Sequence, residues 1–232
     1  NILFDKFADL CDKNDINEKY RENTKILLEL FLVFVWAVFF GRDLLDFNIY
    51  TWPWGREFGS QIITHHIWKN FQNCGWCMLW NGYINGGYPA FADIFGSMLH
   101  PVVMITTLIW GTVIGAKISI VVSLAIAGIA QWWMARTLSV GRLARLWSAF
   151  MVIVAGHLSG RMENAAFGMV ISTATASMLL AAILEVGIKQ TRRAVVVLSL
   201  FGSLTILSGQ GYIQLGVLAW SPALLFFIID TY

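Results

Sequence analysis

The sequence predicts an all-α, polytopic transmembrane helical protein of about six spans, with a large first external loop that carries interfacial helices. Three observations lead to this fold class. Hydrophobic residues make up 57% of the 232 residues and charged residues only 13%, about half the charged share of a soluble domain. The mean hydropathy is +0.65. The apolar residues gather in runs that are separated by brief polar turns.

Charge, cysteine content and motifs exclude several function classes. A net charge of +2 is too small to indicate a nucleic-acid partner, and three cysteines are too few for a disulfide scaffold. The sequence contains no Walker loop, dinucleotide-binding fingerprint, Gly-x-Ser-x-Gly elbow or zinc-protease motif. No signal-peptide pattern is visible, because a charged segment precedes the first apolar run. The chain begins without methionine and ends just after an apolar run, so we expect it to be part of a longer protein.

Residues 1–24 are predicted to form a cytoplasmic amphipathic segment. Three apolar residues there have helical spacing, which favours a short helix on the membrane surface: Leu3, Phe7 and Leu10. Asp15, followed by Glu18, resembles a capping box and predicts that a new helix begins at this point.

Residues 25–232 are predicted to form the transmembrane domain, whose first span is the apolar run 26–40. Glu29 lies one helical turn after Lys25, so the simplest interpretation is an i,i+4 ion pair near the interface. The further candidate spans are 118–138, 145–157, 165–187, 194–207 and 212–229.

Between the first two spans we expect an external loop at about residues 42–117. Residues 57–72 have an apolar stripe with polar residues between, which is typical of a helix in the membrane plane. Residues 101–115 are apolar but short, and we interpret them as a re-entrant or interfacial segment.

Lysine and arginine favour this arrangement over one in which 101–115 crosses the membrane. If the segment does not cross, the basic turns 136–145 and 189–193 face the cytoplasm with the N-terminus, as the positive-inside rule requires. If it crosses, both turns face outward, against the rule. In the favoured arrangement, the remaining polar segments all lie on the external side of the membrane: 42–101, 157–164 and 208–211.

Two carboxylates stand where the first span leaves the membrane. Asp43 and Asp46 are three residues apart and share one helical face if the helix continues. One of them could be a general base, or a metal ligand, aimed at an acceptor hydroxyl. Arg42 beside them is a candidate binding residue. The alternative is an exposed helix end with solvated charges.

A second ionisable group separates two apolar runs at residues 157–164. Arg161 has the chemistry to bind a phosphate bidentately, and Glu163 to orient it, with His157 nearby. The alternative is an ordinary turn capped by its own charges. Gln210, in the polar turn 208–212, is a weaker hint that a small turn between spans explains equally well.

The stretch 76–101 is crowded with aromatics, glycines, amides and one carboxylate. Glycines permit close backbone approach to a ligand, and tryptophan and tyrosine suit a half-wet layer. We interpret this stretch as the floor of a membrane-surface binding site. Its candidate ligand-binding residues are Trp80, Asn81, Tyr83, Asp93 and His100.

Cys74 and Cys77 have the spacing of a redox motif, but no βαβ pattern surrounds them. A local disulfide or two free thiols are the alternatives that we favour. A zinc site that adds His65 and His66 is disfavoured, and no metal ligands are assigned.

One segment resembles a known family. After a first span with acidic residues and an external loop comes the run Trp80-Asn81-Gly-Tyr83-Ile-Asn-Gly86-Gly87-Tyr88-Pro89, closed by His100-Pro101. This pattern resembles the bacterial YfhO-type membrane proteins, which belong to the C-type (GT-C) polytopic glycosyltransferases. The likeness covers most of 41–215 in order, although only 80–101 is specific. Gly82 stands where the family usually has proline, and His100 where tyrosine is common.

The resemblance implies sugar transfer from a polyprenyl-phosphate-linked donor at the outer face of the bacterial inner membrane. An external aspartate would deprotonate the acceptor or help to bind a divalent cation, while Arg161 and His157 would neutralise the leaving phosphate. The implied partners are membrane lipids, the lipid-linked donor and other membrane subunits, without nucleic acid. The alternative is a non-catalytic accessory or scaffold subunit of a larger membrane complex. A transporter is a third interpretation, which no repeat supports.

Overall fold

The computed structural model describes residues 2–53, 55–82, 86–92 and 96–211, together with residues 215–216, 219–220, 222–223 and 226, and their side chains from Tyr20 onward. The regular secondary structure of these residues is helical except for one antiparallel hairpin. The predicted all-α class is therefore confirmed.

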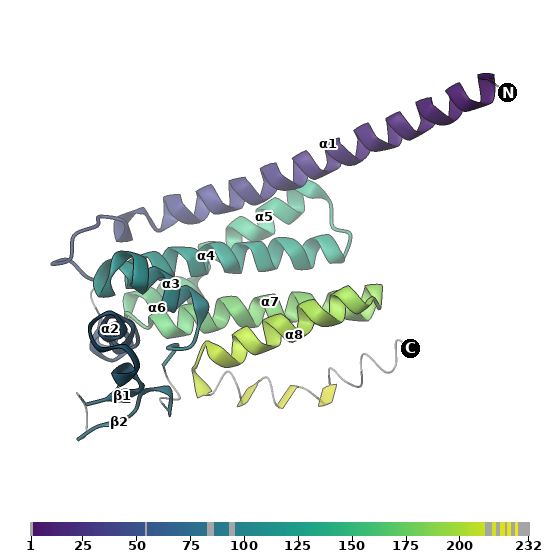
Figure 1. Cartoon of the computed structure of the whole chain (residues 1–232). Helices are drawn as coiled ribbons and strands as arrows, with labels where there is room; N and C mark the ends of the chain where they lie inside the picture. Colours follow the sequence, from purple (N-terminus) through teal and green to yellow (C-terminus); the bar gives the residue numbers. More distant parts are fainter. Residues whose placement is uncertain are drawn as a thin grey trace.

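Five helices lie side by side along one direction (Figure 1): α1 (Ile2–Phe40), α4 (Thr112–Thr137), α5 (Arg142–Ile153), α7 (Phe167–Lys189) and α8 (Arg192–Leu207). The centre is α4, which packs against α1, α5 and α7, while α7 also packs against α8. Small residues allow this close approach. A Cβ on Gly128 would lie 2.6 Å from Ile153 Cδ1 and 2.8 Å from Val33 Cγ1, so α1, α4 and α5 meet at this glycine.

Among the described residues, four helical stretches are long and apolar enough to cross a bilayer: Tyr20–Phe40, Thr112–Thr137, Arg142–Glu163 and Phe167–Lys189. The transmembrane helical character is thus supported, whereas the count of six spans stays a prediction. The candidate span 194–207 lies within α8, which has 16 residues. Most of the candidate span 212–229 lies outside the described residues.

Helix α1 runs without interruption from Ile2 to Phe40, and its first half extends beyond the bundle (Figure 1). The expected helix start at Asp15 is therefore wrong. The segment contains neither glycine nor proline, and extending an existing helix costs far less than nucleating a second one. The cytoplasmic location of residues 1–24 stays a prediction.

The expected Lys25–Glu29 ion pair is also wrong. Lys25 instead pairs with Glu22 at 3.1 Å. Glu29 is only 6% exposed; it forms an ion pair with Arg145 of α5 and accepts a hydrogen bond from Trp132 Nε1 of α4 at 2.8 Å. Because α4 and α5 cover this face of α1, the carboxylate finds its partners across the bundle and ties three helices together.

The segment 101–115 is divided between two helices. Helix α3 (Pro101–Trp110) is 10 residues long, about 15 Å and so about half the hydrocarbon thickness. Gly111 breaks the helix with φ +79°, and α4 begins at Thr112. A Cβ on Gly115 would lie 2.8 Å from Thr106 O and 2.9 Å from Thr107 Cα, so α3 packs with its backbone against the first turns of α4.

The remaining elements gather at one end of the bundle (Figure 1). Helix α2 (Phe58–Cys74) lies across this end, and α6 (Gly156–Glu163) precedes α7. Three short 3-10 helices are η1 (Arg42–Leu44), η2 (Gly75–Leu79) and η3 (Ala90–Ala92). Strands β1 (Trp80–Asn81) and β2 (Tyr88–Pro89) pair antiparallel, with Trp80 opposite Pro89 and Asn81 opposite Tyr88.

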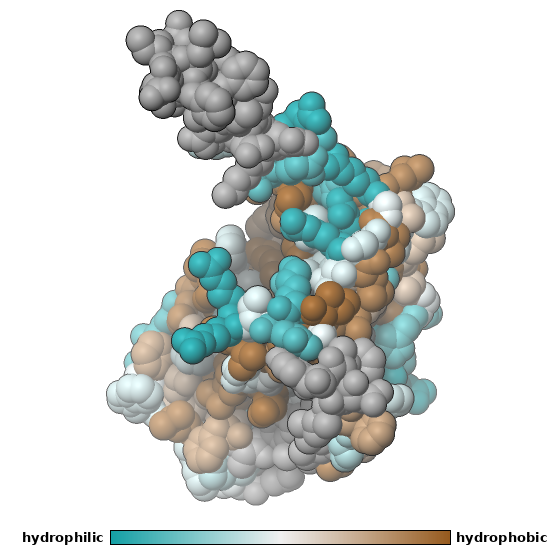
Figure 2. All heavy atoms as spheres, turned by 90° about the vertical axis from the view of Figure 1, so that its right-hand side faces the viewer, coloured by the Kyte–Doolittle hydropathy of each residue, from teal (hydrophilic) through white to brown (hydrophobic). Residues whose placement is uncertain are grey.

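The opposite end carries the α4–α5 and α7–α8 turns. Gln190 ends α7 in the left-handed conformation, and Thr191 caps α8 by accepting the Ala194 N–H at 3.3 Å. Figure 2 looks onto this end and shows hydrophilic side chains beside a hydrophobic surface. Exposed basic residues of these turns include Arg142, Lys189 and Arg192.

We expect Gly115→Ala to lower the melting temperature of the purified protein by several degrees, because overpacking against backbone costs about 1–3 kcal/mol. Thermal unfolding in detergent measures this effect. The matched control is Gly160→Ala in α6, where a Cβ meets nothing within 4 Å. Equal melting temperatures for the two variants would contradict the close contact between α3 and α4.

Candidate functional site

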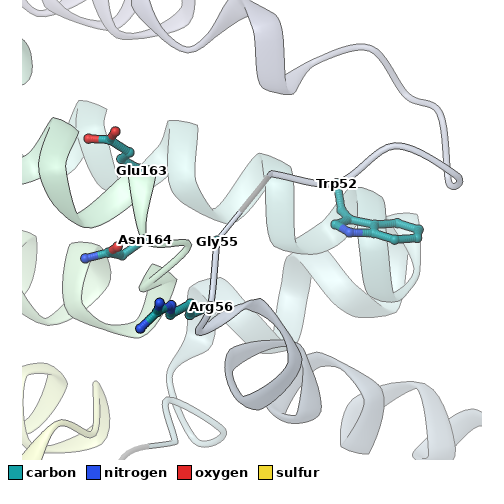
Figure 3. A pocket seen from close by; sticks show the side chains of 5 residues that line it. All are labelled: Trp52, Gly55, Arg56, Glu163 and Asn164. Carbon is teal, nitrogen blue, oxygen red and sulfur yellow. The ribbon is translucent and has the colours of Figure 1, made fainter.

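A cavity of about 630 Å³ opens at the end of the bundle that carries α2 and α6. Two segments far apart in sequence line it: the loop between η1 and α2, and the residues that end α6 (Figure 3). Its lining residues are Trp52, Gly55, Arg56, Glu163 and Asn164.

Backbone contacts hold these two segments together. A Cβ on Gly55 would collide with the backbone of Asn164 and Ala165, so only glycine allows this approach. The Glu57 N–H donates to Asn164 O at 3.2 Å. Ala165 takes a left-handed φ of +57°, and the bonds Ala165 N to Met162 O and Ala166 N to Arg161 O, both 2.9 Å, close the end of α6.

The cavity combines one positive and one negative side chain from different segments. Arg56 and Glu163 are exposed, and neither forms an ion pair within the described part of the chain. Figure 3 shows their side chains and that of Asn164 directed to the same side. A guanidinium binds phosphate or carboxylate bidentately, and an ionised carboxylate accepts protons or hydrogen bonds.

Trp52 supplies the aromatic wall of the cavity. Its ring stacks on Phe58 with centroids 5.9 Å apart, and Phe58 meets Phe167 of α7 edge-on at 5.7 Å. This row of rings anchors the cavity loop to the bundle core.

The Asp46 carboxylate is bound by other side chains of the protein. Its carboxylate forms an ion pair with Lys117 of α4 and accepts a hydrogen bond from the Thr51 hydroxyl. The hydrogen bond from Lys117, followed by that from Thr51, lowers the pKa of Asp46 below its ordinary value. Asp46 is therefore ionised, and both of its oxygens have partners.

Asp43 forms an exposed ion pair with its neighbour Arg42. Its side chain is 91% exposed, and Arg42 Nε lies 3.6 Å from its Oδ1. The Arg42 guanidinium also lies over the Phe39 ring, 4.8 Å from the centroid. Leu45 ends the short helix η1, so the helix does not continue through Asp46 and the two aspartates do not share a helical face.

The described residues of the stretch 76–101 do not contribute to the lining of this cavity. Trp80 is exposed and covers Gly87, whereas Asn81 is buried and donates to the Tyr88 hydroxyl at 3.3 Å. His100 is buried and caps α3 by accepting the Val102 N–H at 3.3 Å. The candidates Tyr83 and Asp93 lie outside the described residues.

The other candidates lie at the same end of the bundle. His157 is exposed and Arg161 half-buried on α6, but neither lines the cavity. Gln210 is buried, and its amide lies against Gly168 of α7. The turn before it is tied into the core, because Ser208 O accepts the hydroxyls of Ser97 at 2.5 Å and Ser172 at 3.0 Å.

The cysteines and histidines of α2 have structural partners. Cys74 and Cys77 form a disulfide, one of the two alternatives expected. His65 is 2% exposed, and its Nδ1 lies 2.6 Å from the Thr107 hydroxyl of α3. Across the described residues, no group of three His, Cys, Asp or Glu could hold a metal ion.

Sequence reasoning singled out Glu163 but missed Trp52, Arg56 and Asn164. A signal was available, because Arg56 follows Trp52-Pro53-Trp54-Gly55, where a cation stands beside two tryptophans at the expected interface. What the sequence did not reveal is that Gly55 meets the end of α6, more than one hundred residues later.

Compared with protein-family models, curated proteins and solved structures, the chain has no match. The resemblance to the YfhO-type proteins therefore stays a prediction. The identification of the candidate site depends only on the geometry described above.

We expect the protein to lose stability as the pH falls below about 6.5. Burial lowers the pKa of His65 from 6.5 to about 3 and that of His100 to about 4. Below pH 6.5 the unfolded chain therefore binds protons that the folded protein does not, at a cost of about 1.4 kcal/mol per pH unit for each group.

His65→Gln retains a hydrogen-bonding side chain next to Thr107 but does not titrate. Melting temperatures measured between pH 7 and pH 5, which include the upper part of the range below about pH 6.5 in which His65 acts, should fall less steeply for this variant than for the wild type. Identical slopes would show that His65 is not buried in its neutral form.

Proposed function

We propose that this chain is a membrane glycosyltransferase-like protein that transfers a sugar from a polyprenyl-phosphate-linked donor at the outer face. The observation that carries the proposal is the pair of unpartnered opposite charges, Arg56 and Glu163, in one cavity at the end of the bundle. The cavity also contains an aromatic ring and an amide, from Trp52 and Asn164. These groups suit a sugar ring with its hydroxyls.

Each group has a role in the transfer step. Glu163 accepts the proton of the acceptor hydroxyl, the acceptor oxygen forms a bond to the anomeric carbon, and the bond from that carbon to the phosphate oxygen breaks. The electron pair remains on the polyprenyl phosphate, where Arg56 compensates the growing negative charge. A divalent cation would assist at the same phosphate, as the family resemblance implies.

The two aspartates expected to be catalytic differ in how far other side chains already bind their carboxylates. The charge of Asp46 is compensated by Lys117, and both of its oxygens already accept hydrogen bonds. Asp43 is exposed and ionisable, and it is the alternative base if the acceptor enters from the side of η1.

Two observations support an outer location for this end. The Cys74–Cys77 disulfide lies beside α2, and disulfides persist in oxidising compartments. The basic turns lie at the opposite end (Figure 1), as the positive-inside rule expects for the cytoplasmic side.

Thiol labelling tests this orientation. In a background without native cysteines, Asp43→Cys and Glu163→Cys should react with a membrane-impermeant maleimide added outside the cell, because both positions are exposed at the cavity end. Arg192→Cys, exposed at the other end, should react only after the membrane is opened. Labelling of positions 163 and 192 from the same side would contradict the proposal.

Substitution of the two cavity charges tests the reaction. With a panel of polyprenyl-phosphate-linked hexoses and a membrane glycan extract as acceptor, release of polyprenyl phosphate in proteoliposomes is the readout. We expect Glu163→Gln to lower kcat by roughly 10²–10⁴-fold, the usual contribution of a general base. Arg56→Gln should raise KM for the donor by about tenfold or more, through loss of a charge-assisted bond.

Matched variants make the result specific. Glu57→Gln removes a neighbouring carboxylate that does not line the cavity, and it should retain activity. Arg161→Gln, measured beside Arg56→Gln, decides which cation serves the phosphate. Unchanged transfer in Glu163→Gln, Asp43→Asn and Asp46→Asn would contradict the role given to these carboxylates, whereas no transfer by the wild type would remove the enzyme proposal and favour a scaffold subunit.

A further inference from the structure

A buried lysine lies under the loop that forms the cavity. Lys117 is on the second turn of α4 and is 3% exposed. Its ammonium has three oxygen partners, all from one loop: the Asp46 carboxylate, Asn48 O at 2.9 Å and Thr51 Oγ1 at 3.0 Å. The loop therefore wraps around a single cation.

The buried position of Lys117 requires a counter-charge, which the loop supplies. The first turns of a helix carry partial positive charge, which disfavours a cation there. A buried ammonium without a counter-charge is strongly destabilising. Asp46 provides the compensating charge, and the two oxygens from Asn48 and Thr51 use the remaining N–H donors.

The loop has its own bonds around the same carboxylate. Asp46 accepts the Asn48 N–H at 3.3 Å and the Thr51 hydroxyl, and the Asn48 side chain accepts the Tyr50 N–H at 2.9 Å. With Lys117 in the centre, residues 46–51 have one preferred conformation.

The cavity wall continues directly from this loop. Trp52 follows Thr51, and Gly55 meets the Asn164 backbone four residues after Thr51. The segment is thus fixed at two points, Lys117 and Asn164, and the cavity residues Trp52 and Arg56 lie between or next to these points.

We propose that Lys117 is the positioning residue of the cavity, and that the role of Asp46 is to hold the loop on Lys117 rather than to act as a base. The inference rests on the proposed function only in treating the cavity as the donor site. It assigns Lys117, whose ammonium binds loop residues 46–51 rather than the residues that line the cavity, to the recognition of the donor.

Hydrogen–deuterium exchange of the full chain in proteoliposomes tests the positioning without any activity assay. Lys117→Met should raise exchange in peptides covering residues 46–57 by about tenfold or more, the effect expected when a fixed loop loses its anchor. Peptides from α7 should stay within about twofold. Lys189→Met is the matched control, because Lys189 forms an exposed ion pair with Glu185 at the far end.

A milder variant covers the case in which Lys117→Met fails to insert. Thr51→Val removes three hydrogen-bond contacts of the loop, with Asp46, Asn48 O and Lys117, without changing any charge, and it should raise exchange in the same peptides by a smaller factor. Unchanged exchange in residues 46–57 of a folded variant overturns the proposal. Equal increases in every peptide also overturn it, because Lys117 would then act on stability alone.

Kinetics separate this inference from the proposed function. If the wild type transfers sugar, Lys117→Met should raise KM for the donor by about tenfold while kcat stays within about threefold, since binding is lost and the base is retained. The acidic limb of the pH–rate profile should be the same in Asp46→Asn and wild type. A shifted limb overturns the role assigned to Asp46. If wild type shows no transfer, the exchange experiment still decides the role of Lys117.

Discussion

An apolar bundle tolerates a buried charge only when a partner compensates it, and this requirement determines how the chain is arranged around α4. Near one end, Arg145 and Glu29 join α5 to α1, with Trp132 of α4 between them. Near the other end, Lys117 of α4 is covered by the loop that follows α1. The two ion pairs fix α1 and its loop along the length of α4. The loop held by the second pair then meets the end of α6 at Gly55, where the cavity lies.

The buried polar groups of the turns also have hydrogen-bond partners within the protein. A carbonyl that water cannot reach needs a donor from the protein. Ser208 O, at the end of α8, accepts hydroxyls from Ser97 and Ser172. Gln61 of α2 accepts the Gly168 N–H at 2.8 Å. These bonds attach α2 and the segment after η3 to α7, so the end of the bundle is a continuous structure from which the cavity walls cannot easily move apart.

Hydropathy was a good guide to where helices lie and a poor guide to what their polar residues do. The predicted spans 165–187 and 194–207 nearly coincide with α7 and α8, because apolar runs and basic turns are local features. Asp46 and Lys117 are 71 residues apart, and Glu29 and Arg145 are 116 apart. No local pattern reveals such pairs, so Asp46 resembled a free catalytic group and Glu29 resembled a member of an i,i+4 pair.

The short helix α3 has a consequence for biogenesis. At 10 residues it is too short to be retained in a bilayer as an independent span, yet Gly111 and Gly115 allow it to fold back along the first turns of α4. Because α4 follows α3 in the chain, the backbone contacts of α3 at Gly115 can form only after the first turns of α4 have been synthesised. The order of translation sets the order of assembly at this end of the molecule.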